Sequence, residues 1–500
     1  MEPSTQTASG NENAHEERAS LKRFSRRALL GLGAIGAATR AEAQVRTPTR
    51  SRPMTVPDAE QRLLRRITNG VTIEDTAWIA SLGYQQYLEW QLGPESIGDP
   101  EAEARCQGFT TINLAPFSLY GQSSDTVTRE VAEAMIARAV YSNRQLFERM
   151  VEFWTDHFHT NIATVGIHKT YEDREVYRKN ALGTFGALLA ASASSPAMLT
   201  YLNNTQSTRT APNQNYAREV LELHTLGVDG GYTQTDVQEV AKCFTGWRVQ
   251  GNTGDARAGL FFYDANRHDN GAKTVLGVPF AAGGGMNDGL NVINILSTHP
   301  STAKFVSRKM LRWLLNYNPP TTLVDDIAGE FLRTGGNIKA MVRRILSYEN
   351  ILWAPPLFKR PFHYIASALR VLNANVTNYG TLRGTYLTGM GQAPFAWGPP
   401  NGLPQAFEYW GTLPLPRWNF AFSLANNSIS GVTVDLPALL MGATTAVQVA
   451  DRIDTVVFAN QMPSVDKAAL ITYLKPDPPS QTRIRDAFGL AIASPAFQWY

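Results

Sequence analysis

Residues 213–232 read NQNYAREVLELHTLGVDGGY, and this stretch decides the fold class. Its apolar residues recur at intervals of three and four, which is the spacing of one face of an α-helix. Gly227 is predicted to end this helix, because glycine tolerates the positive φ of a helix stop. A second helix is expected at 236–246, after a capping box formed by Thr235 and Gln238. Two helices joined by a short glycine turn pack as a hairpin, so the stretch indicates a helical fold.

Helical spacing continues over most of the chain outside this hairpin. The further helices are predicted at about 125–158, 176–193, 287–297, 302–316, 323–334, 338–347 and 361–373, and the short strand candidates at 248–250, 259–263 and 274–276. Residues 390–420 are dense in proline, glycine and tryptophan, which predicts a long loop. We therefore expect a mainly α-helical protein, a large multi-helix bundle-like domain over 56–500 with a small β-hairpin and a long Pro/Trp-rich loop.

The N-terminal residues carry the features of an export signal. Basic residues that include Arg26 and Arg27 precede a short apolar run rich in glycine and alanine, and an A-x-A cleavage site follows at 41–43. The apolar run is much shorter than the ~20 residues that a membrane-spanning helix needs. We therefore expect 1–43 to be a twin-arginine signal peptide and 44–55 a polar linker. The mature protein is then expected in the periplasm or outside the cell, without stable membrane insertion.

Composition excludes two classes of protein. With 43% hydrophobic and 18% charged residues, most of the chain can bury a core and is not disordered. The formal charge is +3 and no dense block of lysine and arginine occurs, so nucleic acid is a poor partner. Cys106 and Cys243 are the only cysteines, too few for a disulfide framework, and the sequence leaves open whether they form one bridge or two thiols.

Four polar residues of the quoted stretch share one helical face: Asn215, Arg218, Glu219 and Glu222. In one interpretation this face is solvated, and Arg218 pairs with Glu222 one turn later. In the other, the paired glutamates point into a cleft, where they hold a divalent metal or act as acid and base, while Arg218 and Asn215 bind substrate. His224 falls on the apolar side, so we expect it to be buried.

Two further patches carry chemistry. Asp156 and His157 follow aromatic residues at the end of a predicted helix, where a histidine beside a carboxylate can serve as ligand or general base. His268 and Asp269 lie in a predicted loop, and the alternative for them is a plain turn held by the aspartate.

Taken together, the patches resemble a bacterial family known as domain of unknown function 1800. The stretches that carry the resemblance are RLLRR at 62–66, FWTDHF at 153–158, the hallmark block 212–247, RHDNGAKTVLG at 267–277, KRPFHYIASALR at 359–370 and GQAPFAWGPPNGLP at 391–404. The resemblance implies a helical, often secreted protein, frequently encoded beside an exported protein with a sulfatase-like fold. It does not supply a reaction.

Our main hypothesis from the sequence is an exported metal-dependent enzyme of the hydrolase type. Its predicted catalytic residues are His157, Arg218, Glu219 and Glu222, with Glu222 or Asp156 as general base. A divalent metal would be held by the imidazole and carboxylate groups of His157, Glu219, Glu222, His268 and Asp269.

Two alternatives remain open. A weaker similarity to animal-type haem peroxidases rests on Asp156-His157 and the HTL triplet at 224–226. It implies haem with His157 distal, and the candidate proximal ligands are His268, His299 and His363. The other alternative is a non-catalytic partner of the co-encoded sulfatase-like protein, with the polar face of 213–226 as the interface.

Trp397 and Trp410 are candidate substrate-binding residues in the long loop. Exposed tryptophan rings on backbone stiffened by proline would form a stacking platform for a polymeric substrate such as a polysaccharide. In the alternative interpretation the rings anchor the loop onto the helical core.

Overall fold

The computed structural model describes residues 59–500, and these residues form one compact unit. The predicted signal peptide 1–43 and linker 44–55 lie outside the described residues. Helices dominate, and strands occur only in small two-stranded sheets, so the prediction of a mainly α-helical fold is confirmed. Among the described residues, no helix has the length and apolar character to cross a bilayer.

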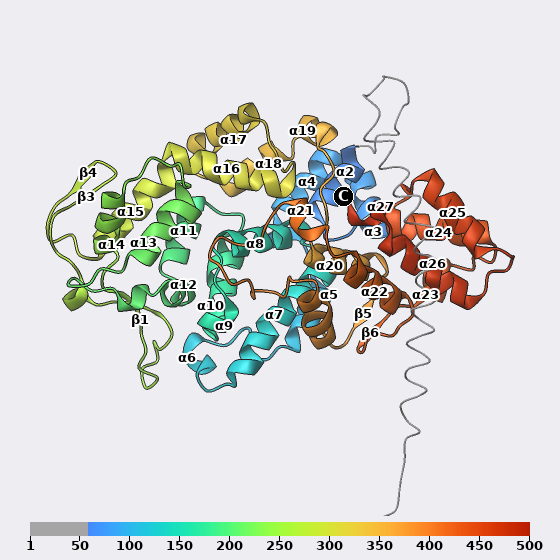
Figure 1. The fold of residues 1–500 in the computed structure, drawn as a ribbon, viewed down its shortest axis with the longest axis horizontal. Coiled ribbons are helices and arrows are strands. Elements are labelled where there is room, and N and C mark those ends of the chain that lie inside the picture. The colour runs from blue at the N-terminus through green and yellow to red at the C-terminus, as the bar shows by residue number, and fades with distance from the viewer. Residues whose placement is uncertain (1–58) are drawn as a thin grey trace, which may run out of the picture. The chain divides into compact units, whose positions relative to one another are not determined.

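In chain order the helices are taken in three groups, and Figure 1 labels most of them. The first group comprises α2 (Ala59–Ile67), α3 (Ile73–Leu82), α4 (Tyr84–Leu92), η1 (Pro94–Ser96), α5 (Pro100–Gln107), α6 (Pro116–Leu119), α7 (Ser124–Tyr141), α8 (Gln145–His157), α9 (Ile162–Val165), α10 (His168–Tyr171), η2 (Glu172–Arg178), α11 (Phe185–Ala193), α12 (Pro196–Tyr201) and η3 (Asn204–Gln206). The second comprises α13 (Gln214–Glu219), η4 (Val220–Thr225), α14 (Gln234–Cys243), η5 (Ala265–Arg267), α15 (Met286–Thr298), α16 (Pro300–Leu314), α17 (Thr321–Arg333), α18 (Ile338–Ile345) and α19 (Tyr348–Trp353). The third comprises α20 (Pro361–Val371), η6 (Leu382–Leu387), α21 (Phe407–Trp410), α22 (Pro414–Ala425), α23 (Leu436–Leu440), α24 (Ala446–Phe458), α25 (Ser464–Leu474), α26 (Gln481–Ala493) and α27 (Pro495–Gln498).

The strands pair locally. The pairs are β1 (Trp247–Val249) with β2 (Phe261–Tyr263), β3 (Lys273–Val275) with β4 (Val278–Phe280), and β5 (Asn375–Val376) with β6 (Val432–Thr433), all antiparallel. The first two pairs are hairpins that follow α14, where the sequence placed its strand candidates. The predicted hairpin is therefore present, and the described residues add a second one directly after it.

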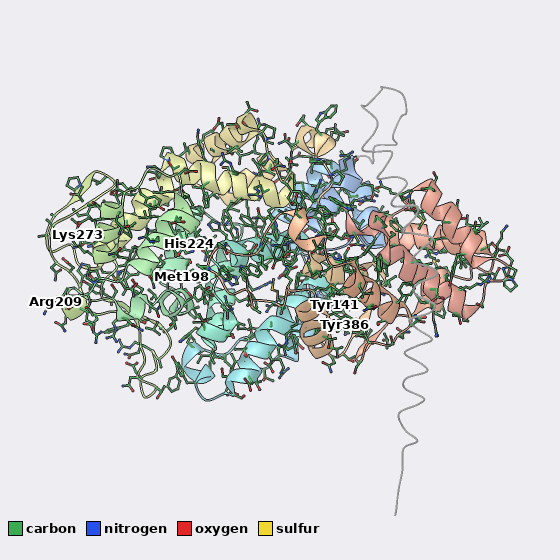
Figure 2. All side chains as sticks on the ribbon, viewed as in Figure 1. Tyr141, Met198, Arg209, His224, Lys273 and Tyr386 are labelled. Carbon is green, nitrogen blue, oxygen red and sulfur yellow. The ribbon has the colours of Figure 1, made fainter. Side chains whose placement is uncertain are left out.

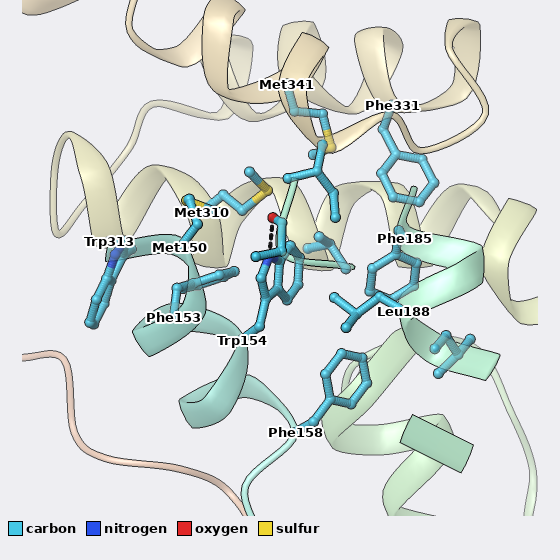
Figure 3. Packing of buried hydrophobic residues seen from close by; sticks show 14 of the residues in the cluster. Met150, Phe153, Trp154, Phe158, Phe185, Leu188, Met310, Trp313, Phe331 and Met341 are labelled. Carbon is cyan, nitrogen blue, oxygen red and sulfur yellow. Dashed lines mark hydrogen bonds between the residues drawn. The ribbon is translucent and has the colours of Figure 1, made fainter. Parts of the chain in front are cut away.

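The hydrophobic core is centred on aromatic side chains of α8 (Figure 3). Trp154 and Phe158 are fully buried and pack against Phe185 of α11, with ring centroids 6.1 and 6.2 Å apart respectively. The Trp154 indole donates a hydrogen bond to the Ala181 carbonyl at 2.9 Å, which satisfies its only polar atom inside the core. Met310 of α16 lies over the same group of rings in Figure 3. One face of α8 is thus fixed by the core, and its C-terminal end carries the FWTDHF stretch.

The end of the chain closes the fold next to α2 (Figure 1). Leu357 and Tyr500 exchange two backbone hydrogen bonds of 2.8 and 2.9 Å, and Lys359 donates to Gln498 at 2.8 Å. The Arg66 guanidinium of α2 lies over the Tyr500 ring. This short pairing of residues 357–359 with 498–500 brings Tyr500 close to the start of α20, where KRPFHYIASALR begins.

The Pro/Trp-rich segment is a long connection, as predicted, but it contains α21 and the first turns of α22. Several hydrogen bonds fasten its first half to the helices, and two of them involve Gln392 and Leu403. The Phe362 amide donates to the Gln392 side chain at 2.9 Å, and the Leu403 amide donates to the Asp156 carboxylate at 2.6 Å. The loop therefore lies against the C-terminal end of α8 instead of extending into solvent.

Candidate functional site

The hallmark block folds as the predicted helical hairpin, with one unexpected element. The helix continues from α13 into η4, which is a π-helix. The Leu226 amide accordingly donates to the Leu221 carbonyl, five residues earlier, at 2.8 Å. The second helix is capped by Thr233 and Asp236, so the predicted capping box at Thr235 is wrong by two residues. Short π-helical segments are rare and occur frequently at functional sites, which directs attention to the side chains around η4.

Four half-buried side chains form what we call the carboxylate face: Arg218, Glu219, Glu222 and Tyr232. The Tyr232 hydroxyl donates to Glu222 Oε2 at 3.1 Å. Arg218 Nη2 donates to Gln234 Oε1 at 2.9 Å, and no ion pair between Arg218 and Glu222 occurs in the described part of the chain. The salt bridge of the solvated interpretation is therefore not formed.

Glu219 lies in a distinct electrostatic environment. Burial raises the pKa of its carboxyl group, the neighbouring Glu222 raises it further, and Arg218 opposes both effects. Within residues 59–500, no side chain or backbone group donates a hydrogen bond to this carboxyl. Asn215, the predicted substrate-binding residue, is exposed at the edge of the same face.

The long loop approaches this face through Tyr201 of α12. The Tyr201 hydroxyl donates to the Gly398 carbonyl, and burial, followed by the charge of Glu219, raises the pKa of the Tyr201 phenol. Trp397 directly precedes Gly398, and its carbonyl accepts a hydrogen bond from His159 at 2.7 Å. Trp397 itself is half-buried, and its ring meets Tyr409 edge to face. Tyr201 thus holds the loop next to Trp397 and senses the charge of Glu219 on the carboxylate face.

The second predicted tryptophan has a structural role. Trp410 is 2% exposed, and its indole donates to the Pro404 carbonyl at 2.6 Å. Its ring packs against Tyr409 with centroids 4.7 Å apart. Trp410 is therefore placed as the alternative interpretation expects, with its ring buried and anchoring the loop.

His157 and His224 are buried neighbours. His157 Nε2 donates to the His224 carbonyl at 3.1 Å, and the two ring centroids are 6.3 Å apart. His157 Nδ1 and both ring nitrogens of His224 have no hydrogen-bond partner in the described residues. Burial, and then the nearby Lys309 ammonium, lower the pKa of His224 to about 3, and the same causes lower that of His157 well below its ordinary value. Both imidazoles are therefore neutral at pH 7, and the expectation of a buried His224 is confirmed.

His268 and Asp269 belong to a separate polar cluster beside β3. His268 Nδ1 donates to the Thr245 carbonyl at 2.8 Å, and Asp288 lies 3.2 Å from Nε2. Asp288 also pairs with Lys273 at 2.8 Å. Figure 2 shows Lys273 well apart from His224, at the end of the fold that carries the hairpins. This cluster fixes β3 to α15 and does not reach the carboxylate face.

The residues predicted to hold a metal do not come together. No group of three or more histidine, cysteine, aspartate or glutamate side chains among residues 59–500 is arranged to hold a metal ion. The predicted ligands are instead divided between the aromatic core, the carboxylate face and the cluster beside β3. Cys106 and Cys243 are free, and burial raises the pKa of the Cys243 thiol to about 12.

The surroundings of His157 also bear on the haem alternative. The rings of Phe153, Phe158, Phe185 and Phe305 pack against it, with centroids 4.4 to 6.3 Å away. A haem bound at His157 would have to displace these rings. The proximal candidates are engaged elsewhere: His268 in its cluster, His299 as the N-cap of α16, and His363 against the Tyr500 ring at 4.4 Å.

Sequence reasoning missed a buried group that we call the central ion cluster: Arg149, Glu152, Asp156 and Arg360. Arg149 pairs with Glu152 at 2.9 Å, and Arg360 bridges Glu152 at 2.9 Å and Asp156 at 3.0 Å. All four side chains are nearly inaccessible to solvent. Asp156 is held by Arg360 and by the Leu403 amide, so it is not free to act as a general base. The charged residues within the aromatic helix α8 were a signal for this cluster.

The architecture defined here is a mainly α-helical domain with a π-helical turn at its hallmark block and a tryptophan-containing loop packed beside it. The family model described as "Protein of unknown function (DUF1800)" matches residues 62–499, so the chain belongs to this family. No curated protein and no solved structure shows significant similarity to the chain. The family assignment confirms the resemblance and leaves the reaction to be argued from the site.

Proposed function

We propose that this protein is an exported enzyme of the hydrolase type that uses Glu219 and Glu222 as an acid and base pair. The observation that carries the proposal is the unequal environment of the two carboxyl groups. Glu219 is half-buried without a hydrogen-bond donor and has a raised pKa, whereas Glu222 accepts a hydrogen bond from Tyr232. Neighbouring titratable groups in unequal environments are typical of a proton donor paired with a base.

In this proposal Glu219 donates a proton to the leaving group and Glu222 activates water. Arg218 lies beside both glutamates but pairs with Gln234, so its charge can hold an anionic or polar group of the substrate. Trp397 is half-buried beside Gly398, which Tyr201 holds by a hydrogen bond, and it would stack on an extended substrate such as an extracellular polymer. The acid and base chemistry needs no metal, in keeping with the separation of the predicted ligands.

A panel of chromogenic esters, glycosides and phosphodiesters, together with polysaccharide hydrolysis, tests the proposal. Glu219→Gln and Glu222→Gln should each lower any hydrolysis by about 10²-fold or more, because each removes one proton-transfer group. Asp229→Asn is the matched control, since Asp229 is exposed at the tip of the same hairpin. The proposal fails if no member of the panel is hydrolysed, or if both glutamine variants retain wild-type rates. Retained rates with lost co-purification of the co-encoded sulfatase-like protein would instead support an interface at this face.

A further inference from the structure

A small cavity lies between α8, α16 and the residues that precede α20. Six of its lining residues matter here: Arg149, Arg312, Trp313, Tyr317, Arg360 and Tyr500. It offers about 20 Å³ to the centre of a water-sized molecule. That is little more than the ~10–15 Å³ that a single water requires, so a larger ligand has to occupy the side of the cavity that is open to solvent. We call it the arginine cavity.

The side chains that line the arginine cavity are rich in hydrogen-bond donors and include no aspartate or glutamate. They carry three guanidinium groups, two phenols and the indole of Trp313. The carboxylates of the central ion cluster, Glu152 and Asp156, line a different cavity, which is also lined by residues of the long loop. Glu152 and Asp156 do not line the arginine cavity itself.

Two of the guanidiniums are held rigidly on the same aromatic ring. Arg149 Cζ lies 4.7 Å and Arg360 Cζ 4.2 Å from the centroid of Trp313. Such cation–π contacts, together with the pairs to Glu152 and Asp156, fix both planar groups in place. Arg149 Nε and Trp313 Nε1 are buried and have no acceptor within residues 59–500. Preorganised, unpaired donors of this kind are costly to bury unless a ligand satisfies them.

Two further cations have no carboxylate partner. Arg312 lines the cavity, and its buried Nε has no acceptor in the described part of the chain. Arg66 lies over the Tyr500 ring, and burial lowers the pKa of its guanidinium to about 10. Arg66 does not line the cavity, so Arg312 is the lining arginine that has no aspartate or glutamate partner in the described residues, and a cation without a counter-charge is costly to bury.

We propose that the arginine cavity binds a small oxyanion, a phosphate or sulfate group that is either free or the end of an ester. Guanidinium groups bind such oxyanions through two parallel hydrogen bonds, which suits the fixed planes of Arg149 and Arg360. Arg312, Tyr317 and Tyr500 are half-buried, so one wall of the cavity reaches solvent and gives the ligand access. The site is separate from the carboxylate face and does not depend on the proposed hydrolase function.

Isothermal titration calorimetry of the mature protein with inorganic phosphate, sulfate and methyl phosphate, at constant ionic strength, tests this site. Arg312→Gln removes one unpaired cation and leaves the central ion cluster intact, so it should raise the phosphate Kd about tenfold or more. Arg312→Lys should lie between wild type and Arg312→Gln, because it keeps the charge but loses the planar fork. The matched control is Arg308→Gln, an exposed arginine one turn earlier on α16, which should leave the Kd unchanged.

Equal binding of methyl phosphate would identify the end of an ester as the ligand, and binding of the inorganic ions alone would identify a free ion. The proposal is overturned if no anion binds at millimolar concentration, or if Arg312→Gln binds as wild type does. Equal weakening by Arg308→Gln would also overturn it, because it would show unspecific attraction to surface charge. Glu219→Gln should bind phosphate normally, so failure of the hydrolase proposal does not remove this one.

Discussion

Replacement of His224 by phenylalanine should make the protein less sensitive to acid. His224 is 1% exposed, and neither ring nitrogen has a hydrogen-bond partner among the described residues. The ring centroid lies 5.1 Å from that of Phe158, so a phenyl ring suits the surroundings. His224→Phe removes the titratable group and preserves an aromatic ring in the core.

The magnitude follows from the lowered pKa. His224 titrates at about 3 in the folded protein. Its ordinary value in the unfolded chain is about 6.5. Between these values the unfolded state binds the extra proton, so stability is fully present above pH 6.5 and is lost as the pH falls toward 3. From pH 7 to pH 5, this one residue should cost about 2 kcal/mol of the free energy of unfolding.

Urea unfolding curves at pH 7 and pH 5 measure the effect. His224→Phe should lose about 2 kcal/mol less than wild type between the two pH values. His299→Asn serves as the control, because it removes a half-buried histidine and keeps an N-cap residue on α16. An identical loss in wild type and His224→Phe would refute the reasoning, since it would mean that His224 is not buried as a neutral ring.

The long loop and the N-terminus give two further predictions. Trp410→Ala should destabilise the protein by about 3–5 kcal/mol, the usual cost of removing a buried tryptophan, and calorimetry should show a lower melting temperature than for Trp397→Ala. A smaller effect at Trp410 than at the half-buried Trp397 would contradict the anchoring role. Replacement of Arg26 and Arg27 by lysine should leave the precursor in the cytoplasm on cell fractionation. Unchanged export would rule out the twin-arginine route.

The local elements could be predicted from the sequence because they depend on neighbouring residues. Helical spacing and the glycine stop located the hairpin of α13 and α14, and the strand candidates fell on β1, β2 and β3. The π-helix η4 could not be predicted, because the apolar spacing fits regular α-helical hydrogen bonds to the fourth residue back equally well. Arg218 bonds Gln234 at the start of α14, a contact across the hairpin that helical spacing cannot show.

The tertiary features could not be predicted, because their partners are far apart in the chain. Arg360 is separated from Asp156 by 204 residues, and neither residue alone signals an ion pair. The resemblance identified both stretches, FWTDHF and KRPFHYIASALR, but not their contact. The separation of the predicted metal ligands has the same cause, because ligand types and local spacing carry no information on how the hairpins, the core and the loop are placed.

The carboxylate face was predicted in outline. The sequence identified Arg218, Glu219 and Glu222 as one polar group, and the structure places all three half-buried beside Tyr232. Tyr232 was not singled out from the sequence, although it lies in the glycine turn of the quoted stretch. Its bond to Glu222 depends on the turn folding back over the helix.

The pH dependence of hydrolysis tests the central claim most directly. If Glu219 donates the proton, kcat/KM of the wild type should fall as the pH rises through the pKa of Glu219, which lies above the ordinary glutamate value. Glu219→Gln should lower kcat/KM by about 10²-fold or more and abolish this alkaline limb, while Asp229→Asn should keep both. An unchanged rate with the same alkaline limb in Glu219→Gln would contradict the assignment of Glu219 as the acid.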